Sequence, residues 1–140
     1  MKIPTLTSIG ATMATAALML LVFGCSQQSY GSLGGVTGTV TLNGKPHANA
    51  KVTFTPAAGR PSSGMTDENG NYELFYIRDT KGAEPGSHKV TIVTVAPVES
   101  DTYQGPAFKD PIPPNYNRVT ELTAEVEKGS NTFDFDLKGK

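Results

Sequence analysis

The chain has 140 residues, in which 12 Lys and Arg oppose 13 Asp and Glu, for a formal net charge of −1 at pH 7. The basic residues form no stripe that could follow a phosphate backbone, which argues against nucleic acid as a partner. With one cysteine, the chain cannot form an internal disulfide. Its many Gly, Pro, Val and Thr residues favour strands and turns over helices.

The first 24 residues have the anatomy of an export signal. Lys2 and the amino terminus supply a short positive region, and residues 9–23 are mostly apolar. A membrane-spanning helix needs roughly 20 apolar residues, and this run is shorter and ends at a small residue. We therefore expect residues 1–24 to be a signal helix, which takes no part in the mature fold.

The end of this segment resembles a bacterial lipobox. Val22 and Gly24 fill its aliphatic and small positions, whereas Phe23 departs from the small residue usual between them. The resemblance implies that the Cys25 thiol receives a diacylglycerol and that Cys25 becomes the new N-terminus. The alternative is an ordinary secretory signal beside an incidental thiol. A lone cysteine in an exported chain favours lipidation, which would make the membrane a partner.

Residues 25–35 are polar, rich in glycine and uncharged, as expected of a flexible tether. The remaining residues 36–138 alternate apolar and polar side chains with a period of two, and we find no helical periodicity in them. We therefore predict one all-β domain, an antiparallel β-sandwich of six to seven strands. The predicted strands are Val36–Leu42, Ala50–Thr55, one from Tyr72, Ser87–Val95, Glu121–Val126 and Asn131–Leu137, with a seventh near Gly64–Thr66.

Turn residues separate these strands. Asn43-Gly44 is a strong hairpin signal, since both residues tolerate positive φ. In the stretch 66–72, Asp67 is suited to accept backbone N–H groups of a tight turn. Residues 127–130 are expected to join the last two strands as a pair. We expect alternate side chains to face the core, among them Val52, Phe54, Tyr72, Leu74, Val90, Ile92, Phe133, Phe135 and Leu137.

The order of these motifs resembles the carboxypeptidase regulatory-like domain. The resemblance implies a transthyretin-like, Ig-like β-sandwich that serves as an interaction module and does not imply catalysis. It also extends to short bacterial lipoproteins built from a signal and one such domain. The motifs that carry it are Gly38-Thr39-Val40, Asn43-Gly44-Lys45-Pro46, Ala50-Lys51-Val52, Thr66-Asp67 with Gly70 and Tyr72, Pro85-Gly86, and residues 112–117.

Two patterns of residues resemble metal-binding sites, and we interpret neither as a metal site. Oxygen-bearing side chains alternate after position 66, but the glycine and the final glutamate of an EF-hand loop are not in place, and turn chemistry explains these residues. The two histidines are interpreted as surface residues, because zinc requires three or four ligands. No cofactor is predicted. The residues concerned are Asp67, Asn69, Asn71, Glu73, His47 and His88.

The long segment Ala96–Asn117 holds five of the ten prolines, with Tyr103, Phe108 and Tyr116 among them. Loops of this length in compact domains are usually functional or disordered. One interpretation is that the segment covers a sheet edge. The other is that its three aromatic residues contact an envelope protein or a glycan.

The sequence thus predicts a lipid-anchored protein of the bacterial cell envelope that presents a non-catalytic β-sandwich. The alternative is a purely structural envelope component that has no dedicated ligand and associates with itself through strand edges. A more remote alternative is a transthyretin-like hydrolase of 5-hydroxyisourate. Residues 136–140 (Asp-Leu-Lys-Gly-Lys) depart from the Tyr-Arg-Gly-Ser terminus of those enzymes, and we therefore do not expect an enzyme.

Overall fold

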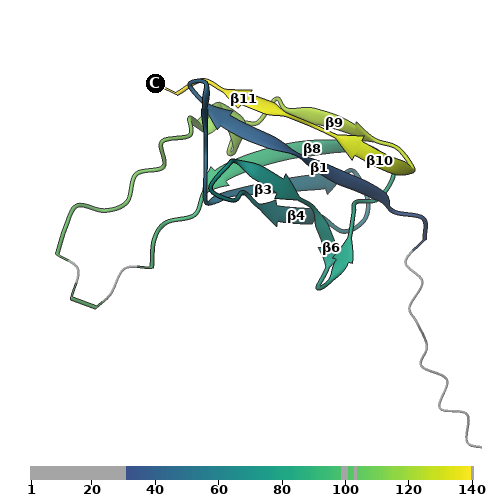
Figure 1. The fold of residues 1–140 in the computed structure, drawn as a ribbon, viewed down its shortest axis with the longest axis horizontal. Coiled ribbons are helices and arrows are strands. Elements are labelled where there is room, and N and C mark those ends of the chain that lie inside the picture. The colour runs from purple at the N-terminus through teal and green to yellow at the C-terminus, as the bar shows by residue number, and fades with distance from the viewer. Residues whose placement is uncertain (1–30, 99–100, 103, 140) are drawn as a thin grey trace, which may run out of the picture.

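The computed structural model describes residues 31–98, 101–102 and 104–139. They form two β-sheets packed face to face, with one short 3-10 helix, η1 (Pro114–Tyr116), and no α-helix in this part of the chain (Figure 1). The prediction of an all-β sandwich is confirmed. The predicted signal helix, Cys25 and Tyr103 lie outside the described residues. Within those residues, no helix is long and apolar enough to cross a membrane.

The first sheet is built around β1 (Gly34–Leu42), which begins two residues before its predicted start. Two short strands follow one another along β1 and pair with it in parallel, and two others pair with it antiparallel. This sheet therefore combines parallel and antiparallel pairs, whereas an antiparallel sandwich was predicted. The parallel strands are β10 (Gly129–Thr132) and β11 (Phe135–Leu137), and the antiparallel ones are β2 (Lys45–Pro46) and β5 (Asn71–Glu73).

The second sheet is antiparallel throughout, in the order β7-β6-β4-β3-β8-β9. Its centre is the long pairing of β3 with β8, from Ala50 opposite Thr94 to Pro56 opposite His88. The expected seventh strand is present as β4. The strands are β3 (Ala50–Pro56), β4 (Ser62–Met65), β6 (Phe75–Ile77), β7 (Thr80–Lys81), β8 (Gly86–Thr94) and β9 (Thr123–Val126).

The Asn43-Gly44 turn is confirmed, with φ of 53° and 79° at its two residues. Positive φ at both positions is the two-residue turn that matches the twist of a hairpin. The strand that follows this turn and pairs with β1 is, however, the two-residue β2. The predicted Ala50–Thr55 strand lies in the other sheet as part of β3. Pro46 stands in β2 and has no N–H to donate, so it cannot extend a regular ladder.

The predicted pairing of the last two strands is wrong. Strand β9 pairs with β8 in the second sheet, whereas β10 and β11 pair with β1 in the first. The Asn131 side chain holds this crossover, because its Oδ1 accepts the Glu127 N–H at 2.9 Å and its Nδ2 donates to the Glu127 and Gly35 carbonyls. Residues 121–126 and 131–137 nevertheless turn their apolar side chains to the same core. Their alternation of apolar and polar residues is therefore the same as in a hairpin.

The core lies between the two sheets, and Phe54 is at its centre. This side chain is fully buried, and its ring centroid lies 5.6 Å from that of Phe133 and 6.2 Å from that of Phe135. The Tyr72 hydroxyl donates to the Phe133 carbonyl at 2.6 Å, and burial raises the pKa of Tyr72 above its usual range. The predicted inward alternation is confirmed, although Phe133 and Phe135 are only partly buried at the edge of this core.

Gly38 is a position at which β1 tolerates no side chain. A Cβ there would lie 1.8 Å from the Phe133 carbonyl oxygen, a backbone atom that cannot move without disrupting the sheet. We therefore expect Gly38→Val to cost at least about 1–3 kcal/mol of unfolding free energy. At Gly35, in the same strand, a Cβ would have its nearest neighbour 3.6 Å away, so Gly35→Ala should change stability by less than about 0.5 kcal/mol. Equal urea midpoints for the two variants would contradict this.

Candidate functional site

One end of the sandwich gathers segments that are far apart in the sequence. We call it the loop end and define it by the Asn43-Gly44 turn, Thr94, residues 108–118 and Gly139. The Gly139 N–H donates to Asn43 Oδ1 at 2.9 Å, and the Thr94 N–H donates to Asp110 Oδ2 at 3.0 Å. The segment after β8 projects from this end, while β1 begins at the opposite end (Figure 1). Strand β1 runs between the two ends over nine residues, or roughly 25 Å.

The Ala96–Asn117 segment divides at Asp110 into two parts. Before Asp110, every described residue from position 96 is exposed. After it, Ile112 enters the core and is 3% exposed, and the chain lies along residues 90–94, the part of β8 that β9 leaves unpaired. There Asn117 Nδ2 donates to the Ile92 carbonyl at 3.4 Å, and the Thr120 hydroxyl donates to the Val90 carbonyl. The edge-covering interpretation therefore holds for the second part only.

Asp110 fixes the point at which the chain returns to the sandwich. Its two carboxylate oxygens accept different backbone N–H groups, that of Thr94 at 3.0 Å and that of Ile112 at 2.8 Å. We expect Asp110→Ala to cost about 1–3 kcal/mol, because it leaves two partly buried N–H groups without their charged acceptor. Amide hydrogen exchange should accelerate at Thr94 and Ile112. Unchanged protection at both amides would show that Asp110 does not hold the segment.

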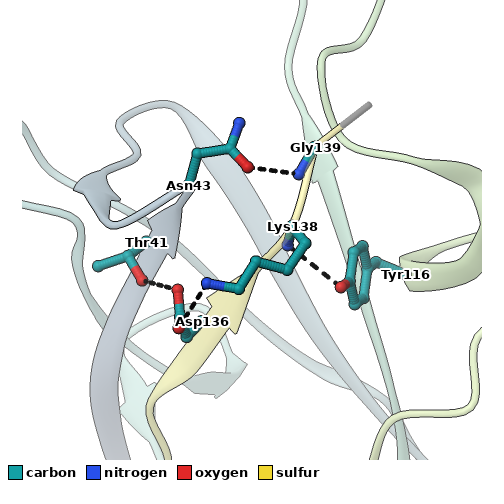
Figure 2. Close-up of polar contacts among 6 residues, drawn as sticks. All are labelled: Thr41, Asn43, Tyr116, Asp136, Lys138 and Gly139. Atoms are coloured by element: carbon teal, nitrogen blue, oxygen red, sulfur yellow. Dashed lines mark hydrogen bonds and ion pairs between the residues drawn. The ribbon is translucent and has the colours of Figure 1, made fainter.

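The C-terminal strand supplies a second polar network at the loop end (Figure 2). Asp136 accepts from the Thr41 hydroxyl at 3.0 Å and from Lys138 Nζ at 3.1 Å. The hydrogen bond from Lys138, followed by that from Thr41, holds the pKa of Asp136 below its usual range. The Lys138 N–H donates to the Tyr116 hydroxyl at 3.2 Å. Tyr116 therefore joins the edge-covering segment to β11 and packs against the core.

A groove of about 930 Å³ opens at the loop end between the Asn43-Gly44 turn, the end of β8 and residues 108–118. Sites for small ligands commonly measure about 300–1,000 Å³, so this groove is large enough for a short segment of a partner. Its apolar wall includes Leu42, Phe108 and Pro111. Lys109 and Arg118 also line it, and neither forms an ion pair with any described residue.

The structure separates the three predicted contact residues. Phe108 lines the groove and is 39% exposed. Tyr116 lies in the polar network and does not line the groove, and Tyr103 is outside the described residues. Sequence reasoning missed Lys109 and Arg118, because nothing in the order of residues indicates that positions 109 and 118 share a groove with Leu42.

The interpretation of both histidines as surface residues is wrong for His88, which is 2% exposed. Its Nε2 donates to the Glu84 carbonyl at 2.7 Å, and its ring packs beside Phe54. The period of β8 could have revealed this, because His88 is two residues before the inward-facing Val90. His47 is half-buried, and its Nε2 is 2.8 Å from the Thr94 hydroxyl.

The alternating polar residues after position 66 form a turn, as predicted. Asp67 Oδ1 accepts the N–H groups of Asn69 and Asn71, both at 2.9 Å, and Gly70 has a φ of 76°. Within the described ranges, no group of three or more His, Cys, Asp or Glu side chains is placed to hold a metal ion. The backbone of the turn thus uses the carboxylate oxygen that a calcium loop would need.

Comparison with known proteins assigns no family. No family model matches the sequence, and no curated protein matches it. Among solved structures, the chain is similar to a DUF3823 family protein from Parabacteroides merdae, with 13% sequence identity and a TM-score of 0.44. The match covers 76% of this chain and 46% of the other, so this chain spans less than half the length of that protein. At this level of similarity we draw no functional conclusion, and the carboxypeptidase regulatory-like resemblance stays a prediction.

Proposed function

We propose that this chain is a bacterial envelope lipoprotein, anchored through Cys25, whose β-sandwich is a non-catalytic interaction module that presents its loop end to another envelope protein. One observation carries the proposal: β1 begins at the end of the sandwich opposite the groove and the projecting segment (Figure 1). An anchor that precedes β1 would hold the opposite end near the membrane and direct the groove away from it.

The length of the tether supports this orientation. Cys25 precedes Gly34, the first residue of β1, by nine positions. A flexible chain of this length and composition has a root-mean-square span of about 15–18 Å. That is enough to keep the sandwich clear of lipid headgroups while the opposite end remains close to the surface. A diacylated cysteine provides the two chains that stable anchoring requires.

The chemistry of the groove supports binding over catalysis. Its carboxylate, Asp110, has each oxygen engaged by a backbone N–H. The other charged groups that line it are the side chains of Lys109 and Arg118. Nucleophilic catalysis requires a nucleophile, a base in hydrogen-bonding reach of it and a third group that orients the base. The Thr94 hydroxyl of the groove is 2.8 Å from His47 Nε2, but among the described residues no side chain is hydrogen-bonded to the other ring nitrogen of His47.

Two measurements test the two parts of the proposal. Intact mass spectrometry of the protein extracted from membranes should give a chain that begins at Cys25 and carries a diacylglyceryl group. An unmodified Cys25, or a chain that begins at Met1, would contradict the anchor. Deletion of Asp101–Lys109 should abolish recovery of the envelope partner while the thermal melting curve stays unchanged. Unchanged recovery with an intact fold would contradict the role of the loop end.

A further inference from the structure

The polar side chains that line the groove differ in whether they are already hydrogen-bonded. Both oxygens of Asp110 accept backbone N–H groups, and the Thr94 hydroxyl is 2.8 Å from His47 Nε2. Asn117 is also satisfied, since Nδ2 donates to the Ile92 and Pro113 carbonyls and Oδ1 accepts the Arg118 N–H. These hydrogen bonds hold the groove together, and each Asp110 oxygen and the Thr94 hydroxyl keep a further lone pair.

The polar side-chain groups of the groove that have no partner among the described residues are all donors. Lys109 Nζ and the Arg118 guanidinium have no partner among the described residues, and Asn43 has Oδ1 engaged by the Gly139 N–H while its Nδ2 is unused. Lysine, arginine and an amide NH₂ can only donate. A ligand that complements them must therefore offer acceptors, and the two positive charges favour acceptors that are anionic.

The walls between these donors are apolar and stiff. Phe108, Leu42 and Pro111 contribute carbon surface, and Pro113 and Pro114 line the same groove. Proline fixes its own φ and has no N–H, so this wall offers few backbone donors and loses little conformational entropy when a ligand binds. Apolar side chains of a ligand would be accommodated here without the addition of a β-strand to the sheet.

From this combination we infer that the groove binds a short acidic and apolar peptide segment of the partner, in which carboxylates meet Lys109 and Arg118 and apolar side chains contact Phe108 and Leu42. The inference rests on the proposed function, because it names the chemistry of the partner at the same site. A neutral glycan fits less well, since its hydroxyls carry no charge to pair with Lys109 and Arg118.

Synthetic peptides test this directly on the full chain purified from cells. The probe is a capped hexapeptide that alternates Asp and Leu, and its counterparts carry Asn or Lys in place of Asp. We expect the Asp peptide to bind about tenfold more tightly than the Asn peptide at about 0.15 M salt, with amide chemical-shift changes concentrated in residues 108–118. Equal affinity for the Asp and Asn peptides would overturn the inference.

Charge reversal provides the matched variants. The double variant Lys109→Glu/Arg118→Glu should weaken binding of the Asp peptide about tenfold or more. The control is Arg60→Glu/Lys128→Glu, which changes net charge equally at two exposed cations near the opposite end, and it should bind within about twofold of the unmodified chain. The melting temperatures of both double variants are first compared with that of the unmodified chain. If the Lys109→Glu/Arg118→Glu variant is unstable, Lys109→Gln/Arg118→Gln is used in its place. Equal losses in test and control variants would also overturn the inference.

The peptide result and the proposed function can fail separately. If a photoreactive residue at Phe108 crosslinks to an envelope protein but the Asp peptide has no advantage, the loop end is an interaction surface and the acidic specificity is wrong. If the Asp peptide binds as expected but a photoreactive residue at position 108 gives no crosslink in cells, the inferred ligand chemistry is correct. The proposal that the loop end binds an envelope protein is then wrong. If the protein binds glycans of an array more tightly than it binds the peptides, the inferred ligand class is wrong.

Discussion

Phe54→Ala is expected to lower the free energy of unfolding by about 3–5 kcal/mol, the cost of removing a fully buried aromatic ring from a packed core. The Phe54 side chain is 0% exposed and lies beside Phe133, Phe135 and His88, so it connects residues of both sheets. Its removal would leave a cavity between rings that belong to different strands, and such a cavity cannot collapse without moving both sheets.

Urea unfolding followed by circular dichroism would measure this loss. The matched control is Phe108→Ala, because Phe108 is 39% exposed and lies in the loop-end groove. It should cost less than about 1 kcal/mol, which also makes it suitable for binding experiments. A loss below about 1 kcal/mol for Phe54→Ala would mean that the core is not centred on this ring.

Cys25→Ala is expected to release the protein from the membrane. Burial of acyl chains contributes about 0.8 kcal/mol per CH₂ group, and the substitution removes the sulfur atom that would carry them. We therefore expect the membrane-bound fraction to fall at least tenfold, which corresponds to about 1.4 kcal/mol or more. Cell fractionation followed by immunoblotting measures it. Phe108→Ala should stay in the membrane fraction, and a Cys25→Ala chain that also stayed there would contradict lipid anchoring.

Features that depend on neighbours in the sequence were predicted correctly. Asn43-Gly44 forms its turn because the required positive φ is a property of those two residues. The Asp67 turn follows from a side chain that reaches N–H groups two and four residues further on. The inward positions of Val52, Phe54, Val90 and Ile92 follow from the two-residue period of a strand.

Features that depend on which strands pair were not predicted. The alternation of residues 121–126 and 131–137 is the same whether they form a hairpin or enter opposite sheets, so the parallel pairing of β10 and β11 with β1 could not be read from it. Pairing also decides the candidate site, because the groove joins Leu42, Phe108, Lys109 and Arg118 only through the fold. His88 differs, since its inward position was readable from the period of β8 and was missed.

The most direct test of the proposed orientation compares the two ends of the sandwich in living cells. A photoreactive amino acid is placed either at Phe108, in the groove, or at Lys128, an exposed residue near the start of β1. We expect the Phe108 position to crosslink to an envelope protein and the Lys128 position not to do so. Crosslinks at Lys128 alone, or only to further copies of this chain, would contradict a module that presents its loop end to a partner.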